Sequence, residues 1–593
     1  MANRHSAKII EIKTDLPKNQ RFKWGVFDSE TWPTEGMGRN IFALGVTRIS
    51  TVRDYKVFRD PESMWSYLID KRHAGYTWYA HFIQYDFPIV TGQNILSLLN
   101  DCIFSGTRLV RGTYQGEGYE VYFADSLNLL PVSLKKLIKD KDTPKKFLEQ
   151  GHRHVITEDD IRYCKADVAA VIDAIHGLEV LFGRPCGYTL ASSALIDWRT
   201  KYLPAPLVCT RRPDEPWRDT YFGGRVQVFK QGTYSNINIY DVNSMYPWVL
   251  FHYPLPVPFI RDPVDKDPGN FTKLLGSYND MKVTGWASCW VDVPKGFTVL
   301  PKRIPGEGNQ YPVGKFHGSW TWQELRLAVR TGTKILKVHE AWQHPVQFYG
   351  HQKFIAYWYQ ARLKAKKDKN HLFDLLIKLI MNASYGKYGE GRERKTPGRA
   401  DDKPRPGWTF TSIDHDHAHE RGAYGFWLPP EGQGRDPTEH TVMSWASSIT
   451  SWARVRLAEL ILEAGIDNVY YCDTDSVHTT AKLVESEELG GLKLEHVVLA
   501  GHYVAKKHYK LTYEKDGKIV CEAKCKGVPI RDPWKWDPYA KNIKINRLAL
   551  AKESMRRGLP AGSKIIAVRE FDSRKWTSNL PMLDEDEYVV EED

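Results

Sequence analysis

The sequence predicts a multidomain α/β chain, assembled from α+β modules rather than from a repeated unit. Its 593 residues correspond to about three to five domains. Apolar and polar residues alternate over residues 23–60, as in the strands of a meander, whereas residues 347–388 have helical periodicity. Hydrophobic residues make up 42% and charged residues 26%, which is typical of a globular chain and excludes general disorder.

The other elements follow from periodicity and from helix and turn signals. A helix is expected over residues 159–181, where Thr157 and Asp160 form a capping box at its start. The remaining expectations, in chain order, are a proline-rich link over 204–216, strands and loops over 255–345, a basic helical hairpin over 347–388, a long loop or projecting hairpin over 391–440, a helix over 443–464 and a β-hairpin over 471–480.

The distribution of charge indicates a polyanionic partner. The chain carries +11, but its last eleven residues, from Leu583, hold seven acids and no base, so removing these acids leaves +18 on the preceding 582 residues. A basic body with 20 Trp and 31 Tyr is typical of proteins that bind nucleic acid, although both features also occur in other proteins. The acidic tail is expected to be a solvated terminus, with a DNA mimic as the alternative.

Neither a membrane protein nor a disulfide-rich protein is indicated. No apolar run approaches the roughly 18 residues of a membrane span, and the first residues lack the apolar core of a signal peptide. The eight Cys are scattered without a CxxC pair, which favours reduced thiols over a disulfide framework or a zinc site. We therefore expect a protein that is not secreted.

Two carboxylates at a turn form the sharpest local signal. In YCDTDSVHTT, strand-like residues flank a turn that carries Asp473 and Asp475. Because neighbouring carboxylates repel each other, a divalent cation would stabilise them, although a solvated Asp-rich turn is the ordinary alternative. A third carboxylate, Asp241, ends the alternating strand of NINIYDVNSMYP, with Tyr246 just beyond it. Oxygen ligands from two separate strands suit Mg²⁺ in phosphoryl transfer.

The segment KLIMNASYG offers a cationic helix face. On a helix, Lys378, Asn382 and Tyr385 lie within about 60° of one another, so an ammonium, an amide and an aromatic ring share one side. This combination suits a phosphate and a base, although an amphipathic helix with a solvated Lys is the ordinary alternative.

The first third of the chain contains a second set of carboxylates. WGVFDSETW places Asp28 and Glu30 on one face of a strand, and YAHFIQYDFP places Asp86 after an apolar strand. RYCKADVAAV places Tyr163 and Asp167 on one face of a helix. Two acids on a strand are usually a surface feature, but four carboxylates and a Tyr can bind two metals and orient a water toward a phosphodiester.

The order of these motifs resembles the family B DNA polymerases. DVNSMYP, KLIMNASYG and YCDTDS follow one another as the three polymerase motifs of that family do. The carboxylates of the first third resemble the family's 3′–5′ exonuclease motifs, which implies catalytic roles for Asp28, Glu30, Asp86, Tyr163 and Asp167. Three further segments match in register and imply DNA contacts at Tyr221, Gly223, Gly224, Thr450, Arg454, Lys507 and Tyr509.

One departure from the exonuclease pattern concerns contact with the degraded strand. Where the family's second motif has Asn, this chain has His81. Ser126 and Leu127 resemble a further single-strand-binding motif. The family's auxiliary lysine corresponds to Lys145 or Lys146, and the spacing leaves both open.

The chain resembles most the small protein-primed branch, the bacteriophage and linear-plasmid replicases. It is short for a proofreading member and carries blocks at the positions of that branch's two terminal-protein regions. The resemblance implies an RNase H-like 3′–5′ exonuclease domain followed by a right-hand palm–fingers–thumb polymerase domain. The implied boundaries are 1–195 for the exonuclease domain, 196–258 and 441–530 for the palm, 259–348 and 391–440 for insertions resembling terminal-protein regions 1 and 2, 349–390 for the fingers, and 531–593 for the thumb and acidic tail.

The resemblance also implies the metal ligands. Asp241 and Asp475 would hold the catalytic metals together with the Val242 carbonyl, and Asp473 would lie close by. The expected ion is Mg²⁺, two per active site, with Mn²⁺ able to substitute. In the exonuclease site the implied metal ligands are Asp28, Glu30, Asp86 and Asp167.

The substrates are implied in the same way. Lys507 and Tyr509 would hold the primer end, and Tyr246 would stack under the sugar of the incoming nucleotide and exclude a 2′-hydroxyl. The implied nucleotide-binding residues are Tyr246, Arg362, Lys366, Lys378, Asn382 and Tyr385.

The expected partners are template and primer DNA, dNTPs and a terminal protein as candidate primer, with no membrane partner and a monomeric chain. The expected location is the cytoplasm of a bacterial host, or an organelle for a linear-plasmid enzyme. Initiation from a nucleic-acid primer or without any primer stays open, and a non-enzymatic nucleic-acid-binding scaffold is the alternative of a different class. The histidines of DHDHAH, from Asp414, are expected to lie in a flexible polar loop rather than in a metal site.

Overall fold

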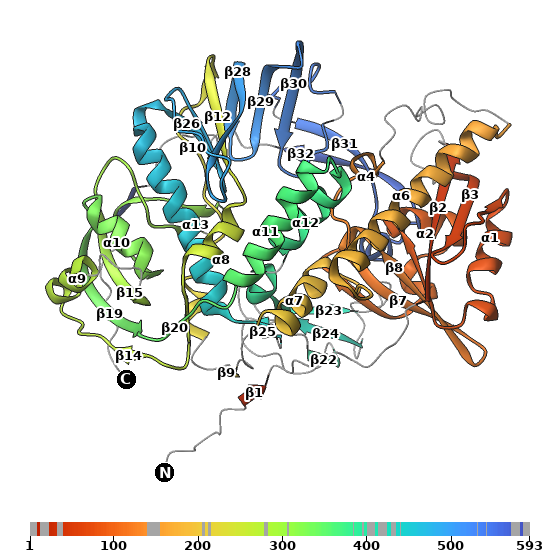
Figure 1. Cartoon of the computed structure of the whole chain (residues 1–593), viewed down its shortest axis with the longest axis horizontal. Helices are drawn as coiled ribbons and strands as arrows, with labels where there is room; N and C mark the ends of the chain where they lie inside the picture. The colour runs from red at the N-terminus through yellow and green to blue at the C-terminus, as the bar shows by residue number, and fades with distance from the viewer. Residues whose placement is uncertain are drawn as a thin grey trace.

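The structure is a computed structural model with three main sheets, joined by helices (Figure 1). Sheets from the first third of the chain and from the palm segments lie at the right and top of the view, and a third sheet lies at the left. The structure describes residues 9–11, 23–32, 40–138, 155–203, 208–210, 215–277, 283–304, 307–383, 385–393, 396–399, 409–412, 424–428, 435–438, 440–530, 532–540, 542–570 and 582–584.

The first third folds around a seven-stranded sheet in the order β4-β3-β2-β5-β8-β7-β6. Strands β2, β3 and β4 pair antiparallel in sequence order, so the predicted meander is confirmed, while β5 pairs parallel with β2. The predicted capping box of Thr157 and Asp160 is present at the start of α6, which packs on β2 and β3. The bounds are β2 (Lys23–Trp32), β3 (Ile41–Ile49), β4 (Lys56–Phe58), α1 (Pro61–Leu68), β5 (Tyr76–Ala80), α2 (Ile83–Thr91), α3 (Ile95–Leu98), β6 (Asn100–Ser105), β7 (Arg108–Gly116), β8 (Tyr119–Asp125), α4 (Leu134–Leu137), α6 (Glu158–Phe182) and α7 (Leu190–Lys201).

The second sheet combines segments from before and after the helical hairpin. Its strands follow the order β10-β26-β27-β12-β28-β29-β30, and β11 pairs with β28. The predicted hairpin is β26–β27, and the predicted helix α13 has the expected bounds. The bounds are β10 (Val226–Val228), β11 (Gly232–Tyr234), β12 (Ile237–Val242), α8 (Met245–His252), α13 (Met443–Ala464), β26 (Val469–Asp473), β27 (Ser476–Thr479), β28 (Leu492–Ala505), β29 (His508–Lys515) and β30 (Lys518–Cys525).

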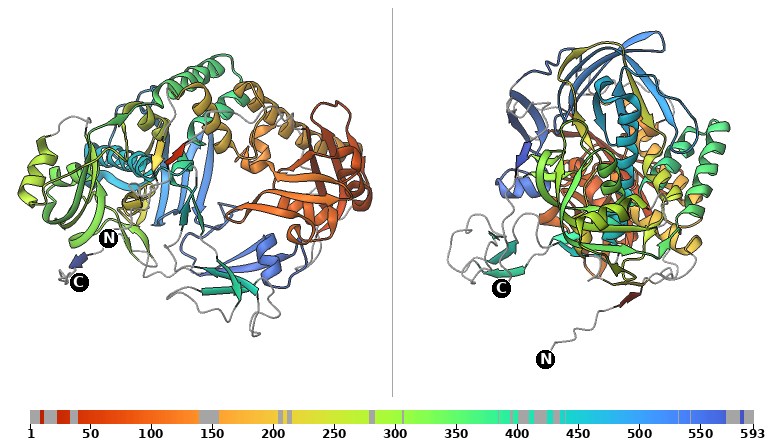
Figure 2. Two further views of the ribbon diagram at one scale, coloured as in Figure 1. Left: turned by 90° about the horizontal axis from the view of Figure 1, so that it is seen from below. Right: turned by 90° about the vertical axis from the view of Figure 1, so that its left-hand side faces the viewer.

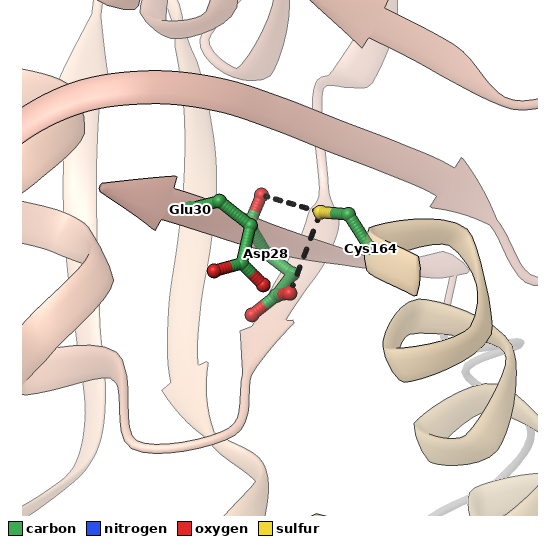
Figure 3. Close-up of side chains that lie close together, drawn as sticks. All are labelled: Asp28, Glu30 and Cys164. Carbon is green, nitrogen blue, oxygen red and sulfur yellow. Dashed lines mark hydrogen bonds between the residues drawn. The ribbon is translucent and has the colours of Figure 1, made fainter. Parts of the chain in front are cut away.

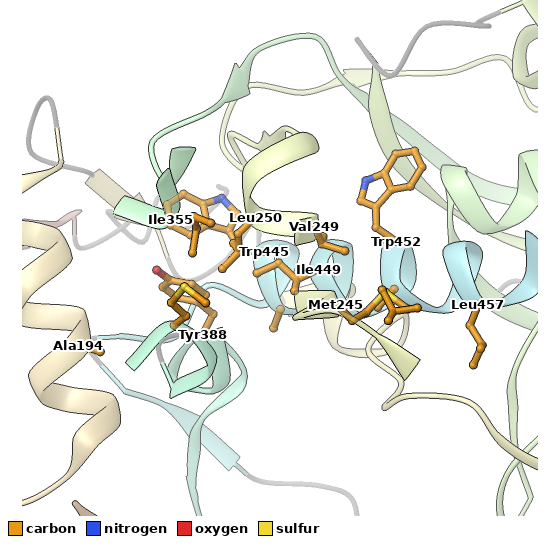
Figure 4. Close-up of a cluster of buried hydrophobic side chains, with 14 of the residues drawn as sticks. Ala194, Met245, Val249, Leu250, Ile355, Tyr388, Trp445, Ile449, Trp452 and Leu457 are labelled. Atoms are coloured by element: carbon orange, nitrogen blue, oxygen red, sulfur yellow. The ribbon is translucent and has the colours of Figure 1, made fainter. Parts of the chain in front are cut away.

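Helices α8 and α13 carry the core behind this sheet. Figure 4 shows Met245, Val249 and Leu250 of α8 beside Trp445 and Ile449 of α13, and all five belong to one cluster of buried side chains. Because burial of such side chains is worth about 1.5–3 kcal/mol each, this packing fixes the position of the sheet's functional strands.

The helical hairpin consists of α11 (Gln352–Lys367) and α12 (His371–Ala383), followed by the short helix η4 (Tyr385–Gly389). Helix α12 also packs against α6 and α7 of the first module. Gly177 of α6 permits this close approach, because a Cβ there would lie 2.9 Å from Cδ1 of Leu376. The hairpin is thus held between the two modules.

The third sheet belongs to the segment between β12 and the hairpin, in the order β14-β19-β15-β18-β33. Strands and loops were predicted here; two helices, α9 and α10, occur in addition, with α10 packed against α13. The bounds are β13 (Leu255–Pro256), β14 (Asp262–Pro263), α9 (Pro268–Ser277), β15 (Thr284–Val293), β16 (Lys302–Ile304), β17 (Gly308–Gln310), β18 (Val313–Thr321), α10 (Trp322–Arg330), β19 (Lys334–His344), β20 (Gln347–Phe348) and β33 (Met582–Asp584).

Strand β33 corrects the expectation of a solvated acidic terminus at Leu583 and Asp584, the two residues of that tail that the structure describes. Met582 to Asp584 pair parallel with β18, and Leu583 packs against the main core. Gly314 has a φ of +93°. A Cβ added at this position would clash with the Leu583 carbonyl oxygen, so any residue with a side chain would prevent β33 from pairing here.

The strands within residues 391–440 and those near the end of the chain form small sheets that project to one side of the molecule (Figure 2). Within residues 391–440, where a loop or hairpin was predicted, the bounds are β21 (Gly391–Glu393), β22 (Thr396–Arg399), β23 (Thr409–Ser412), β24 (Tyr424–Leu428) and β25 (Arg435–Pro437). Near the end of the chain they are β31 (Asn542–Leu548), α14 (Ala551–Arg556) and β32 (Lys564–Glu570), and β1 (Ile9–Glu11) pairs with β9 (Val208–Thr210). The DHDHAH histidines lie outside the described residues. Among the residues described, no helix is long and apolar enough to cross a membrane.

Candidate functional site

Strand pairing in the palm sheet brings the three predicted polymerase carboxylates into one pocket. Asp241 is the penultimate residue of β12, opposite Ser476 of β27, and the Val242 amide donates to the Asp475 carbonyl at 2.8 Å. Thr474, at the tip of the β26–β27 turn, has a φ of +64°. A cavity of about 440 Å³ is lined by Asp241, Asp473 and Asp475.

Glycine at position 224 is required for this turn. A Cβ on Gly224 would lie 2.8 Å from the side chain of Thr474. The Thr474 amide donates to the Arg225 carbonyl at 2.7 Å, so the segment before β10 lies directly against the turn. Gly224, predicted as a DNA contact, therefore has a structural role that the sequence motif did not reveal.

Two of the three carboxylates have raised pKa values. Burial raises the pKa of Asp241 to about 7, and repulsion from Asp475 and Glu495 adds to the effect. Burial likewise raises the pKa of Asp475 to about 6, with a further contribution from Asp473. Lys378 opposes both shifts. The pocket is thus short of positive charge, and its oxygen donors suit a hard divalent cation.

Asp473 differs from its two neighbours because it already has cationic partners. Its carboxylate lies 3.1 Å from Nζ of Lys507 and 3.3 Å from Nζ of Lys524. Burial opposes ionisation of Asp473, but the two lysines lower its pKa below the usual value. Lys524 was missed from the sequence, because it reaches the site only through the pairing of β30 with β29, where it stands opposite Tyr509.

Glu495 is a second residue that sequence reasoning missed. It lines the same pocket and raises the pKa of both Asp241 and Asp475. The register between β12 and β28 shifts at this point, since Ile239 pairs with His496 while the next residue of β12 pairs with Leu494. The bulge leaves Glu495 as the extra residue and directs it into the site, as bulges often do near active sites.

The predicted nucleotide-binding residues lie along the α11–α12 hairpin, with one correction. Lys378 is exposed on α12 and Lys366 is exposed on α11. Asn382 donates to the Lys378 carbonyl at 2.9 Å, within its own helix. The prediction that Tyr385 shares this helix is wrong, because α12 ends at Ala383.

Tyr385 nevertheless reaches the site from η4. Its ring stacks on that of Tyr246, with the ring centroids 4.2 Å apart and the planes at 24°. Arg362 is 8% exposed and is engaged by Asp374 at 2.8 Å and by the Ser244 hydroxyl at 3.1 Å. Arg362 therefore holds α11 to α12 and α8 and is not a free phosphate ligand in this conformation.

The predicted DNA contacts at Thr450 and Arg454 are not supported, because each residue is only 3% exposed. Arg454 forms a buried ion pair with Glu324 and donates to the carbonyls of Phe222 and Gly223. It therefore supports the segment that contains Tyr221, Gly223 and Gly224 instead of meeting a ligand itself.

The two residues expected at the primer end lie near this pocket. Lys507 is at a turn with φ of +55° and its side chain faces Asp473. Tyr509 is 6% exposed and lines the pocket beside Lys524. Tyr221 is half-buried, and its hydroxyl would be 2.8 Å from a Cβ on Gly389.

The exonuclease carboxylates form a second, separate cluster. Asp28 and Glu30 come from β2, Asp86 from the first turn of α2, and Tyr163 and Asp167 from α6. Oδ1 of Asp86 accepts from the hydroxyl and the amide of Ser29, at 2.7 and 3.1 Å. These bonds join α2 to β2, so the acids are fixed by two elements that the sequence had predicted separately.

The acids of this cluster are surrounded mainly by one another. Burial raises the pKa of Asp28 to about 6. Burial and then repulsion from Asp28 raise the pKa of Glu30 and of Asp86 well above their usual values, and Asp167 and Asp86 also act on Glu30. Burial, followed by Asp167 and Glu30, raises the pKa of Tyr163, so its hydroxyl stays protonated. Buried carboxylates of this kind fit divalent cations.

Two of the residues expected to contact the degraded strand, His81 and Ser126, lie within hydrogen-bond distance of each other. Nδ1 of His81 lies 2.9 Å from the Ser126 hydroxyl, and its Nε2 lies 2.8 Å from the Val132 carbonyl. Ser126 is fully buried, so the expectation that it contacts DNA is not supported, and it positions His81 instead. Leu127 is half-buried beside it, and Lys145 and Lys146 lie outside the described residues.

Comparisons with known proteins find similarity to DNA polymerases in sequence and one shared fold in structure. The family model for DNA polymerase type B, organellar and viral, matches residues 137–396. A DNA-directed DNA polymerase of Enterobacteria phage PRD1 is 26% identical over 60% of this chain and 59% of its own length. A probable DNA polymerase of Neurospora intermedia is 23% identical over 78% of this chain and 54% of its own length. The chain thus spans a little over half the length of these two relatives.

Solved structures with the same architecture include Phi29 DNA polymerase. Its orthorhombic crystal form has a TM-score of 0.69 at 17% identity and covers 93% of this chain and 100% of that chain. Phi29 DNA polymerase complexed with primer-template DNA and incoming nucleotide substrates has a TM-score of 0.66 at 17% identity and covers 93% of this chain and 99% of that chain. The resemblance stated from the motifs and the predicted fold class, an exonuclease domain followed by a palm–fingers–thumb domain, are confirmed.

Proposed function

Since the chain is a relative of the organellar and viral type B DNA polymerases, we propose that it is a template-directed DNA polymerase with 3′–5′ proofreading exonuclease activity. The observation that carries the proposal is the presence of two separate carboxylate sites, one on the palm sheet and one on the exonuclease sheet. A nucleic-acid-binding scaffold would not need either set of buried, mutually repelling acids, because such acids destabilise a fold unless they serve a site.

In the polymerase site, we assign metal binding to Asp241 and Asp475, with the Val242 carbonyl as a third donor. Divalent ions, Mg²⁺ in the first place with Mn²⁺ able to substitute and two per site, would neutralise the developing charge and favour ionisation of the primer 3′-hydroxyl. Bound cations would favour the ionised forms of Asp241 and Asp475, whose pKa values are raised by burial first and then by repulsion from neighbouring carboxylates.

The remaining residues bind and orient the nucleotide and the primer. Lys378 is placed to offset negative charge in the pocket, and we assign it to the triphosphate, with Lys366 further along the hairpin. The stacked rings of Tyr246 and Tyr385 form a rigid wall that would support the sugar and limit space for a 2′-hydroxyl. Lys507 is assigned to the primer end.

In the exonuclease site, the proposed work is hydrolysis of the terminal phosphodiester. Asp28, Glu30, Asp86 and Asp167 are the proposed metal ligands, and the protonated hydroxyl of Tyr163 would donate to the water or the phosphate. His81 would contact the single strand in place of the Asn that the family uses. Because hydrolysis would take place in a module separate from the polymerase site, one chain could both add and remove nucleotides.

Template-directed synthesis is tested by supplying a primed template, one labelled dNTP at a time and a divalent metal salt. The proposal requires that only the dNTP complementary to the next template base is incorporated, and that a chelator stops incorporation. Binding of the template without any incorporation would favour the scaffold and overturn the proposal.

We further propose that a terminal protein supplies the primer and that the enzyme displaces strands while replicating a small linear genome. The support is the placement of the 259–348 and 391–440 segments on either side of the α11–α12 hairpin, where the protein-primed branch carries its terminal-protein regions. The proposed boundaries of the exonuclease, palm, fingers and thumb segments stay those implied by the motifs.

Priming is tested by omitting the primer. Template and labelled dNTPs are supplied with and without a candidate terminal protein, and the labelled product is analysed by denaturing electrophoresis with and without protease. Label that is attached to protein supports protein priming, whereas label in free oligonucleotide supports primer-independent initiation and contradicts it.

A further inference from the structure

A buried thiol lies among the exonuclease carboxylates. Cys164 of α6 is 0% exposed, and its Sγ lies 3.5 Å from Oδ2 of Asp28 and 4.0 Å from the Asp28 carbonyl. Figure 3 shows the thiol pointing from the helix toward Asp28, with Glu30 beside it. One ligand atom from each of the three residues lies within 4.8 Å of the others. Within the part of the chain that the structure describes, this is the one such grouping of three or more His, Cys, Asp or Glu.

The spacing fits a tetrahedral ion that binds sulfur and oxygen together. Zinc bonds of about 2.3 Å to sulfur and about 2.0 Å to oxygen, set at the tetrahedral angle, separate the two donor atoms by about 3.5 Å. The Cys164 sulfur and the Asp28 oxygen have this separation. Glu30 supplies the third donor from the same face of β2, and a water or the phosphate of a bound strand can complete the set.

Donor chemistry separates this cluster from the palm pocket. Mg²⁺ prefers oxygen donors and gains little from a thiol, whereas Zn²⁺ and Cd²⁺ bind thiolates strongly. The palm pocket offers Asp241, Asp473 and Asp475, and its lining includes His478 and His496 but no cysteine; among the described residues, these side chains do not form a group of three with ligand atoms close enough to share one ion. A thiophilic ion therefore distinguishes between the two sites, although the carboxylates of both suit Mg²⁺.

We propose that Cys164, Asp28 and Glu30 form a binding site for thiophilic divalent cations inside the exonuclease centre, so that Zn²⁺ or Cd²⁺ stops strand degradation while DNA synthesis continues. Binding replaces the S–H bond of Cys164 with a sulfur–metal bond, and the proton passes to water. The inference rests on the proposed exonuclease function only for its effect on degradation, because metal binding itself is measured without any reaction.

The binding test is a Cd²⁺ titration of the full chain, followed by the ultraviolet charge-transfer absorption of cadmium–thiolate bonds. Cys164→Ser is the main variant, since serine has nearly the same shape and still donates to Asp28. Cys102→Ser is the matched control, because Cys102 is a half-buried thiol away from the carboxylates. We expect the absorption of one thiolate in wild type and in Cys102→Ser, and its loss in Cys164→Ser. Equal absorption in all three proteins would overturn the proposal.

The functional test measures degradation of a labelled single strand at constant Mg²⁺ while Zn²⁺ is increased. Wild type should lose degradation at a Zn²⁺ concentration at least about tenfold lower than Cys164→Ser, since loss of a ligand weakens metal affinity by that order. Primer extension by the two proteins should respond to Zn²⁺ alike. If wild type degrades no strand in Mg²⁺ alone, the proposed exonuclease function fails, while the cadmium absorption still decides the metal site. If degradation occurs and both proteins respond equally to Zn²⁺, the metal-site inference fails.

Discussion

The two carboxylate sites of this molecule each hold several acids that repel one another, and they differ in how that repulsion is offset. On the palm sheet, Asp473 is paired with Lys507 and Lys524, and Lys378 acts on both remaining acids. Among the described residues of the other module, the pKa of Glu30 is raised by burial first and then by other carboxylates. The palm site therefore carries part of its neutralising charge within the protein, whereas the described residues that act on Glu30 are acids.

This difference has a consequence for stability. An acid whose folded pKa is raised binds protons more tightly in the folded state, so ionisation of that acid at neutral pH destabilises the apo-protein. The exonuclease acids have this property, and the described residues whose charges raise their pKa values are acids, so we expect that module to gain more from bound metal than the palm does. Strain of this kind is common in functional sites.

The largest expected effect comes from removing one site at a time. Asp475→Ala should lower nucleotide incorporation on the order of a thousandfold, because it removes a proposed metal ligand, and should spare 3′–5′ degradation. An Asp28→Ala/Asp86→Ala double variant should do the opposite. Primer extension and single-strand degradation measured on the same preparations check both expectations.

A surface control accompanies these variants. Asp467→Ala alters an exposed acid near the same β-hairpin and should change neither activity. If Asp475→Ala extended primers at the wild-type rate, the assignment of the polymerase site would be wrong. Loss of both activities in either variant would mean that the two sites are not independent.

The next largest effect is expected when the two lysines that pair with Asp473 are removed. A Lys507→Met/Lys524→Met variant leaves Asp473 buried beside Asp475 without either partner, so the pKa of Asp473 should rise. Incorporation should fall about tenfold, which corresponds to roughly 1.4 kcal/mol in the transition state. The deficit should increase as the pH falls, because protonation of Asp473 then becomes easier.

Lys526→Met is the matched control, since Lys526 is an exposed lysine just beyond the same strand. Exonuclease activity should be unchanged in both variants. An unchanged rate of incorporation in the double variant would show that the two lysines neutralise Asp473 without serving synthesis.

A smaller effect, on stability, is expected from the repulsion among the described exonuclease acids. In a chelator, Asp86→Asn should stabilise the protein by about 1 kcal/mol at neutral pH, because Asn keeps an oxygen for the two Ser29 bonds and removes one charge. The wild-type contribution of Asp28, with its pKa raised to about 6, is present below about pH 4 and is lost as the pH rises through about 6. The gain from Asp86→Asn should therefore be larger at about pH 8 than at about pH 5.

Thermal unfolding with and without Mg²⁺ checks this expectation. Added Mg²⁺ should raise the melting temperature of wild type more than that of Asp86→Asn, and more at the higher pH. Asp54→Asn, at an exposed acid of the same module, is the control and should show neither effect. A destabilised Asp86→Asn protein at neutral pH would contradict the electrostatic comparison.

The sequence was sufficient for the carboxylates because their spacing is local. Asp28 and Glu30 share a strand face through the period of two, and helix α13 has the bounds that its apolar pattern indicated. Lys524 and Glu495 could not be found in this way, since they reach the palm pocket through strand register and a bulge. The motif match at Arg454 predicted a DNA contact, but the residue forms a buried ion pair, and a sequence motif does not distinguish between these two roles.

The smallest expected effect concerns His81, where the predicted exonuclease motif differs from that of the family it resembles. Because an Asn side chain is too short to meet both Ser126 and Val132, His81→Asn should lose one of two hydrogen bonds, worth about 1 kcal/mol. Degradation of a single strand should fall about fivefold, and primer extension should not change. Ser126→Ala removes the same contact from its other end, so the double variant should be no slower than His81→Asn alone if both act by orienting the imidazole. Additive losses would instead mean that Ser126 contributes separately, and faster degradation by His81→Asn would mean that the histidine restrains the strand. Either result would show that the two sites of this chain differ in substrate contact as well as in charge.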